Sequence, residues 1–509
     1  MNSPATTKTP ASSKPIYMIG DPKFSNPSKG IAPHPLEGIG HIRNLDILTN
    51  PGSVRLNNLT TKQSSTTVTG QILWQRVHAA TGKVYAIDGN GIVYTALNTG
   101  GTWTVIGNAT GSGNNNTANA GQGLEVWKDY VITIGSSGFD AYDINGTTWH
   151  NNFGSTAHDG SPTYRPMLWS IDDSLYIGNS RYVSRLQEVT TFDPTSSGTY
   201  TFTQQAITLA TNYEVRSIRD LGSNLMLGTV YLGSRTLADI FPYARTTLTL
   251  GIPIRIVENG VQAMYNLGNR LYVLAGLSGK LFVTDTVSAT QIAQIPNYII
   301  NLDANSALQM YPDAIMYMRG KIWFGIGNST LGNAGVWSYD VTRKVLQMEN
   351  IISLGTDGSA NSVYISSLQP FLSNNTYLMA WSDGASSSFG VDMINSSQRY
   401  TGYLGYIDSP LVKVGEALAN MTTPQLEINL TKPLVTGQGV KIQYRKDLTS
   451  AWTTLSTADF ATLGGYQATN ISASVMTSLV FLQIRALLTT AGSSNLSPEL
   501  QSVLLVNPT

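Results

Sequence analysis

The sequence contains no cysteine and few charged residues. The absence of cysteine among 509 residues excludes disulfides, thiolate metal ligands and cysteine nucleophiles, and it fits assembly in a reducing cell. Charged residues make up 12%, and 31 basic residues balance 31 acidic ones; the usual charged share is about a quarter. Because no long basic run occurs, neither nucleic acid nor an anionic membrane is the expected primary partner.

Long hydrophobic runs are also missing. No segment approaches the roughly 18 apolar residues of a membrane-spanning helix. The polar, proline-rich start of the chain is followed by a single short apolar stretch, Ile16–Ile19, which is far shorter than the core of a signal peptide. We therefore expect a product that is made in the cytoplasm and does not follow the general secretory route.

Short apolar strands separated by glycine-containing turns are abundant, and Val261–Asp285 is the clearest case. Met264–Arg270 predicts a strand running into a turn, and Leu271–Ala275 predicts a second strand. The turn signal Gly276–Gly279 then leads to a return strand at Leu281–Val283. By the usual strand and turn rules this is an antiparallel meander of three strands.

The same pattern recurs along most of the chain. The copies span Val77–Thr95, Leu124–Asp143, Met167–Leu186, Val215–Leu237, Val261–Asp285, Ala314–Asp340 and, more loosely, Val363–Met393. Equivalent positions are roughly 45 to 55 residues apart, as in four-stranded propeller blades. A lone meander leaves its faces open, whereas blades stacked around an axis bury them. We predict an all-β fold with a β-propeller of about seven blades, six or eight being the alternatives; a β-sandwich or β-solenoid fits the period less well.

The segments before the repeats divide into two parts. Residues 1–40 form a Pro-rich N-terminal arm in which many prolines and glycines prevent a long helix or a central strand. This arm is either a disordered tail or an extended segment that lies on a neighbouring subunit. Two alternating stretches, Ile42–Ile47 and Ser53–Leu56, flank the turn Asn50–Gly52. One of these strands is a candidate to pair with the last blade and close the ring.

The stretch Asn98–Trp103 resembles the Asp-box of propeller hairpins, with Ala96 and Asn98 in place of the Ser and Asp of that box. The box is a folding device, because its short polar side chain caps the turn and its tryptophan packs between strands. It occurs in sialidases and in many proteins that are not enzymes, so it predicts a fold rather than an activity.

The repeat ends near Ser409–Pro410, and residues 409–509 have a different pattern. Well-spaced strands are predicted at Leu426–Leu430, Val440–Arg445, Trp452–Leu455, Leu479–Ala486 and Leu500–Val506. About 100 residues with this density of strands predict a C-terminal β-sandwich, immunoglobulin- or fibronectin-like. The predicted domains are thus the arm (1–40), the β-propeller (41–408) and the β-sandwich (409–509).

Residues with catalytic or metal-binding potential are scattered. The histidines are His34, His41, His78, His150 and His158, and no two of them share metal-ligand spacing on one element. His158-Asp159-Gly160 with Tyr164 and Arg165 fits one loop, where a solvated turn is favoured over a catalytic pair. No Walker loop, nucleophile elbow or dinucleotide fingerprint is present.

A sialidase needs an arginine cluster for a carboxylate together with a Tyr–Glu nucleophile pair. Arg165, Arg181, Arg216 and Arg255 are candidates by position only, and Ile252–Arg255 has the wrong order for that family's signature. Carboxylates of another glycosidase can lie far apart in sequence, but Asp21, Asp172 and Asp173 are more simply turn residues. Trp74, Trp127 and Trp169 are candidates for sugar stacking, with packing between blades favoured.

The whole arrangement resembles virion structural proteins of tailed bacteriophages. The features that carry the resemblance are the Pro-rich arm, the segments Ile42–Ile47 and Pro51–Asn58, the propeller repeats and the terminal domain with Ile442–Arg445. The resemblance implies a tail hub or nozzle subunit in a ring around the DNA channel, with copies of itself and with portal, adaptor or fibre proteins as partners. It further implies a location in the virion tail after synthesis in the host cytoplasm, with DNA passing through without sequence-specific binding.

No shaft-like or coiled fibre segment is present, which favours the hub or nozzle over a trimeric fibre. We expect no enzymatic activity and predict no catalytic, cofactor-binding or metal-ligating residue. The alternatives are a receptor- or glycan-binding tail protein, with an exposed aromatic face, and a propeller glycan hydrolase, whose turnover depends on one Asp or Glu.

Overall fold

The computed structural model describes residues 15–507 except 21–26, 34–35, 51, 64–67, 98–101, 108–122, 135–137, 154–163, 171, 234–235, 298, 300–307, 328–332, 356–362, 372–375, 385–386, 416–420, 422–423, 456–465, 471–478 and 492–494. These residues form two compact units. Unit 1 contains residues 1–59, 347–349 and 395–509, and unit 2 contains residues 60–346 and 350–394. No helix in the described ranges is long and apolar enough to span a membrane.

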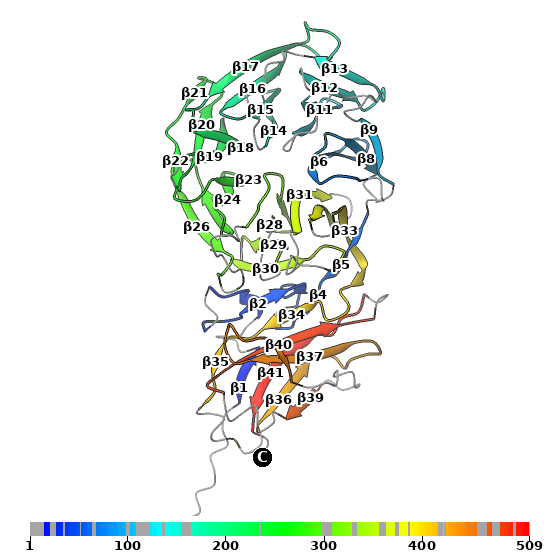
Figure 1. Ribbon diagram of the computed structural model, residues 1–509, viewed down its shortest axis with the longest axis vertical. Helices are drawn as coiled ribbons and strands as arrows, with labels where there is room; N and C mark the ends of the chain where they lie inside the picture. Colours follow the sequence, from blue (N-terminus) through cyan, green and yellow to red (C-terminus); the bar gives the residue numbers. More distant parts are fainter. Residues whose placement is uncertain are drawn as a thin grey trace, which may run out of the picture. The chain divides into compact units, whose positions relative to one another are not determined.

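Unit 2 contains seven antiparallel sheets that surround a common centre (Figure 1). Blade 1 consists of β6 (Ile72–His78), β7 (Lys83–Asp88), β8 (Val93–Leu97) and β9 (Thr104–Gly107). Blade 2 consists of β10 (Leu124–Trp127), β11 (Tyr130–Ile134), β12 (Phe139–Asp143) and β13 (Trp149–Phe153). Blade 3 consists of β14 (Met167–Ser170), β15 (Ser174–Asn179), β16 (Tyr182–Glu188) and β17 (Tyr200–Thr208).

The remaining blades follow in chain order. Blade 4 consists of β18 (Tyr213–Leu221), β19 (Asn224–Tyr231), β20 (Ala238–Ala244) and an outer strand in two pieces, β21 (Thr249–Leu250) and β22 (Ile254–Ile256). Blade 5 consists of β23 (Val261–Leu267), β24 (Arg270–Ala275), β25 (Lys280–Thr284) and β26 (Ala289–Gln294). Blade 6 consists of β27 (Ile315–Met318), β28 (Lys321–Ile326), β29 (Gly335–Asp340) and β30 (Val345–Asn350). Blade 7 consists of β31 (Val363–Phe371), β32 (Thr376–Asp383), β33 (Ser388–Arg399) and β5 (Asn58–Lys62).

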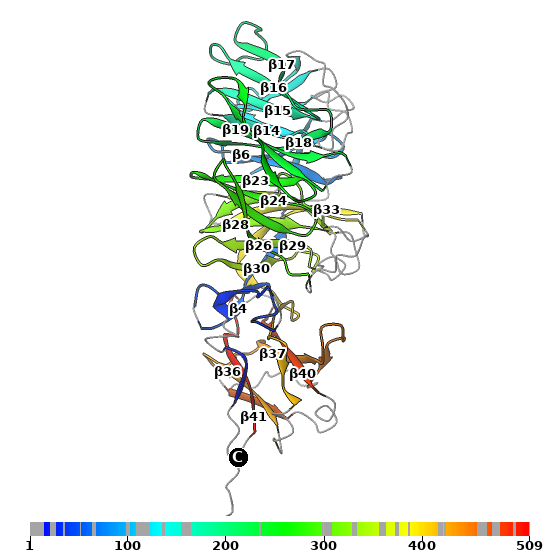
Figure 2. The same cartoon turned by 90° about the vertical axis from the view of Figure 1, so that its left-hand side faces the viewer.

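The first strands of the blades form a closed circle. Each of them contacts the first strands of both neighbouring blades, from β6 through β10, β14, β18, β23, β27 and β31 back to β6. In both ribbon views blade 3 runs outward from β14 to β17 (Figures 1 and 2). The predicted seven-bladed propeller is therefore confirmed by its sheet topology, and each predicted repeat corresponds to one blade.

The ring is closed by a strand from the start of the chain. β5 is the outer strand of blade 7, beside β33, so the last blade takes strands from both ends of the propeller sequence. The two stretches that were candidates for this role lie in unit 1 instead, as β2 (His41–Arg43), β3 (Leu45–Asp46) and β4 (Arg55–Leu56). Pairing β5 with β33 leaves no open edge on the last blade at this position.

Blade 5 shows why these sequences form strands and turns. β24 lies between β23 and β25, and its residues from Leu271 to Ala275 are buried. Burial on both faces requires a continuous apolar run rather than alternation. Gly276 and Gly279 have φ angles of 75° and 64°, which glycine adopts without the steric cost that a Cβ brings.

The apolar core of the propeller is divided into layers between neighbouring blades. One layer joins blades 1 and 2, another joins blades 2 and 3, and a third joins blades 7 and 1. Trp103, the tryptophan of the predicted Asp-box, is buried in this third layer. Asn98 to Gly101 of the box lie outside the described residues.

Unit 1 contains two larger sheets and a small hairpin of β3 and β4. The first sheet has the order β1 (Ile16–Ile19), β41 (Leu500–Val506), β36 (Gln425–Leu430) and β39 (Tyr466–Asn470). The second has the order β2, β34 (Gly405–Asp408), β40 (Phe481–Thr489), β37 (Gly439–Arg445) and β38 (Thr453–Thr454), with β35 (Val412–Lys413) beside β40. A 3₁₀ turn, η1, spans Pro27–Lys29. The immunoglobulin- or fibronectin-like sandwich stays a prediction.

The N-terminal arm contributes a strand to its own chain. In β1, Ile16 pairs with Leu505 and Tyr17 with Leu504. Unit 1 therefore takes strands from both ends of the sequence. The propeller was predicted over residues 41–408, and the compact unit that contains most of the blade residues covers 60–346 and 350–394.

Candidate functional site

The innermost strands of the propeller carry charged residues that meet near its axis. Arg76 is on β6, Glu125 on β10, and Asp313 lies just before β27. The Arg76 Nε donates to Glu125 Oε2 at 2.9 Å, and its Nη1 donates to Asp313 Oδ1 at 2.6 Å. The charges of Asp313 and Glu125 outweigh the opposing effect of burial and raise the pKa of Arg76. Blades 1, 2 and 6 are thus joined by one guanidinium.

Asp313 extends this network to blade 7. Its Oδ2 accepts hydrogen bonds from Ser367 Oγ at 2.6 Å and from the Gln75 backbone N–H at 3.1 Å. Gln75 Nε2 in turn donates to Ser367 Oγ at 3.1 Å. All three residues are buried, so these hydrogen bonds take the place of water for the groups that make them, while the buried Gln75 Oε1 finds no partner among the described residues. We call Arg76, Glu125, Asp313, Ser367 and Gln75 the axial network.

Arg219, on β18, is a second cation close to this network. Its Nη1 donates to the backbone oxygen of Ile218 at 2.8 Å. Burial lowers the pKa of Arg219, and the positive charge of Arg76 lowers it further, while Asp313 and Glu125 act in the opposite direction.

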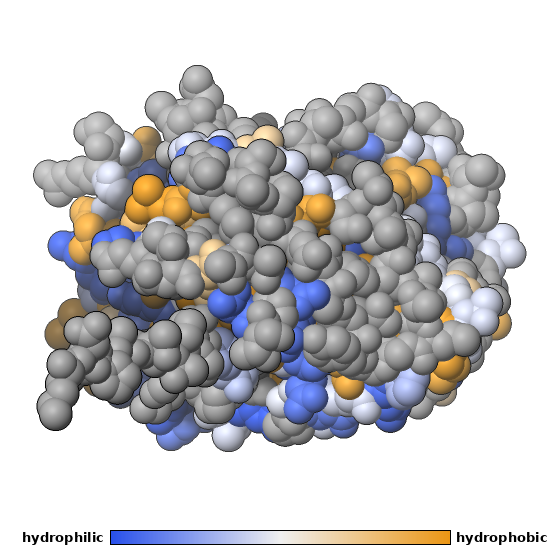
Figure 3. Space-filling view, turned by 90° about the horizontal axis from the view of Figure 1, so that it is seen from below, coloured by the Kyte–Doolittle hydropathy of each residue, from blue (hydrophilic) through white to orange (hydrophobic). Residues whose placement is uncertain are grey.

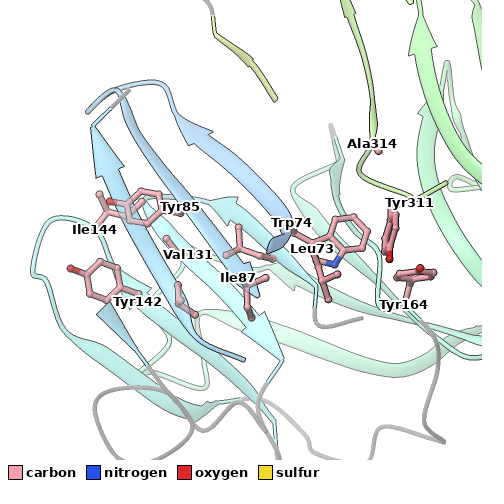
Figure 4. Packing of buried hydrophobic residues seen from close by; sticks show 12 residues of the cluster. Leu73, Trp74, Tyr85, Ile87, Val131, Tyr142, Ile144, Tyr164, Tyr311 and Ala314 are labelled. Carbon is pink, nitrogen blue, oxygen red and sulfur yellow. The ribbon is translucent and has the colours of Figure 1, made fainter. Parts of the chain in front are cut away.

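An aromatic cluster lies beside the axial network. Figure 4 shows Trp74 next to Tyr311 and Tyr164. The rings of Tyr164 and Tyr311 meet edge to face with centroids 5.8 Å apart, and the Arg216 guanidinium lies 5.1 Å from the Tyr164 centroid. Burial raises the pKa of both tyrosines, so they stay protonated at neutral pH.

Polar contacts also join neighbouring blades at the far ends of the inner strands. His78 Nε2 lies 3.0 Å from Asp129 Oδ1, between blades 1 and 2. Lys128 Nζ lies 3.0 Å from Asp173 Oδ1, between blades 2 and 3. Asn266 Nδ2 donates to Asp220 Oδ1 at 3.1 Å, between blades 5 and 4. These contacts add directional links to the apolar layers between the blades.

Only part of the predicted loop candidate belongs to the described residues. His158, Asp159 and Gly160 lie outside the described residues. Tyr164 and Arg165 are buried, and Tyr164 belongs to the aromatic cluster. Among the described residues, the buried Arg165 Nε has no hydrogen-bond partner.

The histidines are dispersed in the structure as well. His150 lies against the ring of Tyr130 in blade 2, with centroids 6.3 Å apart. In unit 1, burial and the charges of Arg485, Arg43 and Arg445 lower the pKa of His41, which keeps its imidazole neutral at pH 7. His34 and the carboxylate Asp21 lie outside the described residues. Within the described ranges, no three His, Asp or Glu side chains gather as a metal-binding group.

The other arginines considered for a carboxylate site have partners of their own. Arg181 contacts the Tyr182 hydroxyl, Arg216 Nη1 donates to Gln262 Oε1 at 3.0 Å, and Arg255 Nε lies 3.2 Å from Asp239 Oδ1. These contacts hold the three guanidiniums at separate places in the propeller.

The tryptophan and aspartate candidates differ in exposure and in the contacts that they make. Trp74 and Trp127 are buried in layers between blades, whereas Trp169 on β14 is 49% exposed. Asp172 and Asp173 occupy the turn between β14 and β15, where Asp172 Oδ2 accepts a hydrogen bond from Tyr176 at 2.9 Å. Trp74 and Trp127 are therefore packing residues. Trp169 keeps an exposed indole, which stacking on a sugar requires.

Sequence reasoning missed the axial network and Arg219. Arg76 stands in a strand with a largely apolar pattern, β6, which is a signal for a special polar position, whereas β18 around Arg219 is mixed and gives no such signal. The partners Glu125 and Asp313 are about 50 and 240 positions from Arg76, and spacing alone does not connect them.

The chain is similar to solved structures of β-propellers but matches no described protein family. No protein-family model matches the chain, and no curated protein does. Similar solved structures include the WD40 repeats of RRP9 (9% identity, TM-score 0.48, 67% of this chain and 99% of that one). The β-propeller domain of Cps50 (Swd1) from Myceliophteria thermophila is also similar (9% identity, TM-score 0.45, 66% of this chain and 100% of that one).

A third similar structure is the extracellular domain of the putative hybrid two-component system BT4673 from B. thetaiotaomicron (13% identity, TM-score 0.45, 74% of this chain and 44% of that one). At these identities and scores none of the three bears on the function of this chain. The class of protein, a seven-bladed β-propeller with a second all-β unit, follows from its own sheet topology.

Proposed function

We propose that this chain is a structural subunit of a bacteriophage virion, of the tail hub or nozzle type, that forms a ring with its own copies around the DNA channel. The observation that carries a structural role is the axial network, in which Arg76 bonds to Glu125 and Asp313 across three blades. The guanidinium is engaged by both carboxylates and links their blades, and a reaction would need at least one of these groups to be available to a substrate.

The position of the segments that resemble phage tail proteins supports the same proposal. Ile42–Ile47 and Pro51–Asn58, from the start of the chain, and Ile442–Arg445, from its end, belong to unit 1. β2 and β37 are strands of one sheet, separated by β34 and β40. Segments about 400 positions apart thus contribute to one compact unit, as expected if they serve one assembly task.

The surface chemistry is suited to packing against other proteins. Figure 3 shows hydrophilic and apolar residues interspersed over the described part of one face. Together with a formal net charge of zero, this favours wet, mixed protein interfaces over a surface that grips DNA phosphates. DNA would pass through such a ring without sequence-specific contacts.

Negative-stain imaging of the purified full chain, with class averages, tests this proposal. We expect closed rings with one fixed number of copies around an open channel. Open chains or irregular clusters would contradict the ring, because a closed ring needs one repeated interface with a fixed rotation.

A second candidate, a receptor- or glycan-binding tail protein, is favoured by Trp169. This indole is 49% exposed on an inner strand, where its face can stack on a sugar ring. Binding to host-surface glycans, measured for the wild type, Trp169→Ala and the control Val105→Ala, separates the two candidates. The glycan-binding role requires saturable binding that only Trp169→Ala abolishes, whereas the structural role predicts no glycan binding by any of the three.

A further inference from the structure

The guanidinium of Arg219 is bonded differently from that of Arg76. Arg76 contacts two carboxylates, whereas no carboxylate of the described residues lies within 4.0 Å of Arg219. Its single hydrogen bond goes from Nη1 to the Ile218 carbonyl of its own strand. The buried atoms that lack hydrogen-bond partners do not include Nε or Nη2 of Arg219, so these donors remain accessible to solvent.

The nearest carboxylates are already occupied. Asp313 accepts hydrogen bonds from Arg76, Ser367 and Gln75, and Glu125 accepts one from Arg76. Their charges favour the guanidinium of Arg219 from a distance, while the charge of Arg76 opposes it. Arg219 therefore presents, from a half-buried side chain, a planar fork of donors that no described protein group occupies, an arrangement suited to bidentate binding of an oxyanion.

Tyr265 on the next blade occupies the position equivalent to that of Arg219. Arg219 lies two residues before the end of β18, Tyr265 lies two residues before the end of β23, and these innermost strands contact each other. Tyr265 is half-buried; burial raises the pKa of its hydroxyl, while the charge of Arg219 lowers it. Blades 4 and 5 thus present one guanidinium and one phenol at equivalent positions of adjacent strands, and a phenol can donate to an anion that the guanidinium holds.

We propose that Arg219, assisted by the hydroxyl of Tyr265, binds the oxyanion group, carboxylate or phosphate, of a small ligand at the propeller axis. The guanidinium supplies Nε and Nη2 as two parallel donors, and Tyr265 supplies a third. This anion site is separate from the ring interface of the proposed function, and the two proposals can be tested independently of each other.

The test is a titration of the full chain in chloride buffer with inorganic phosphate and, separately, with succinate, followed by calorimetry. We expect saturable binding of one of the two, which identifies the chemistry, and a loss of about tenfold or more in affinity for Arg219→Gln, because a charge-assisted hydrogen-bond pair is lost. Arg270→Gln, an exposed arginine on blade 5, is the matched control and should bind as the wild type does.

A second readout separates binding from a structural role. Without added anion, Arg219→Gln should be at least as stable in urea as the wild type, because the substitution removes repulsion from Arg76. Should Arg219→Gln fail to fold, Arg219→Lys takes its place and should lose most of the affinity, since an ammonium lacks the fork. Equal affinity of wild type and variant for the bound anion, or no saturable binding of either anion, would overturn the proposal.

Discussion

Arg76 in blade 1 and Asp313 in blade 6 are joined by a 2.6 Å hydrogen bond between Nη1 and Oδ1, although about 240 positions separate them in the sequence. Their side chains are 14% and 5% exposed. Because both side chains are largely buried, water and salt weaken their attraction little. Removing either partner would leave the charge of the other buried without a counter-charge. The pair links blade 1 to blade 6, which are separated in the ring by blade 7.

Replacing Arg76 tests the structural weight of the axial network. Arg76→Met leaves Glu125 and Asp313 buried without their cation, so we expect the free energy of unfolding to fall by about 3–5 kcal/mol. Urea unfolding at neutral pH measures this loss.

Lys432→Met is the matched control, because Lys432 is 72% exposed in its ion pair with Glu499. An exposed pair contributes little, so this variant should unfold close to the wild type. Equal losses for Arg76→Met and Lys432→Met would contradict the role of the axial network.

Ring closure through β5 can be weakened by one hydroxyl. Thr60 on β5 is buried, and its Oγ1 donates to the Ile351 carbonyl at 2.8 Å. Thr60→Val keeps the shape but leaves that carbonyl without this donor, which should cost about 1–3 kcal/mol of unfolding free energy. Thr104→Val, at an exposed position on β9, should change it by less than about 0.5 kcal/mol. If thermal and urea unfolding rank the two variants in the opposite order, β5 does not hold the ring.

Asp392 on β33 should make stability depend on pH. Burial raises the pKa of Asp392 from 3.8 to about 6, although Ser353 donates to both of its carboxyl oxygens. The native carboxyl thus holds its proton to a higher pH than the unfolded one. Its contribution to the free energy of unfolding is therefore most favourable below about pH 4 and declines as pH rises to about 6.

The variant Asp392→Asn isolates this contribution. The stability of the wild type relative to Asp392→Asn should fall by up to about 3 kcal/mol between pH 4 and pH 7. Subtracting the two urea-unfolding curves at each pH removes the contributions of the other carboxylates. A difference that stays constant with pH, or that rises, would show that Asp392 is not held in its neutral form.

Two tryptophans distinguish packing from exposure. Trp103 is 2% exposed between blades 7 and 1, whereas Trp169 is 49% exposed. Trp103→Ala should lower the free energy of unfolding by about 3–5 kcal/mol through the cavity it leaves, and Trp169→Ala should change it little. Calorimetric melting of both variants measures this; similar melting temperatures would contradict the burial of Trp103.

The sequence predicted the inner three strands of every blade but not the fourth. Runs such as Leu271–Ala275 are apolar because both faces of the strand are covered. Several outer strands are half-exposed: β17 alternates between exposed and partly buried residues, and three of the six residues of β26 are polar. A strand with one solvent face has a weaker apolar pattern, and this is why such outer strands were missed. This reason does not apply to β30, whose residues are all buried.

Long-range pairings set the other limit. β5 pairs with β33, and β1 pairs with β41. The local sequence patterns of Asn58–Lys62 and Ile16–Ile19 do not predict which strand, more than 300 residues away, each of them pairs with. The axial network has the same origin, because Arg76 meets Asp313 only after seven blades have closed the ring. Local pattern therefore predicted the blades, whereas closure and the candidate site depend on tertiary geometry.

The central claim, a ring-forming structural subunit, is tested most directly by sedimentation velocity of the full chain over a wide concentration range. The account predicts one dominant species whose mass is a fixed multiple of 54.8 kDa, without larger open-ended assemblies. A species of 54.8 kDa at every concentration would contradict self-assembly into a ring.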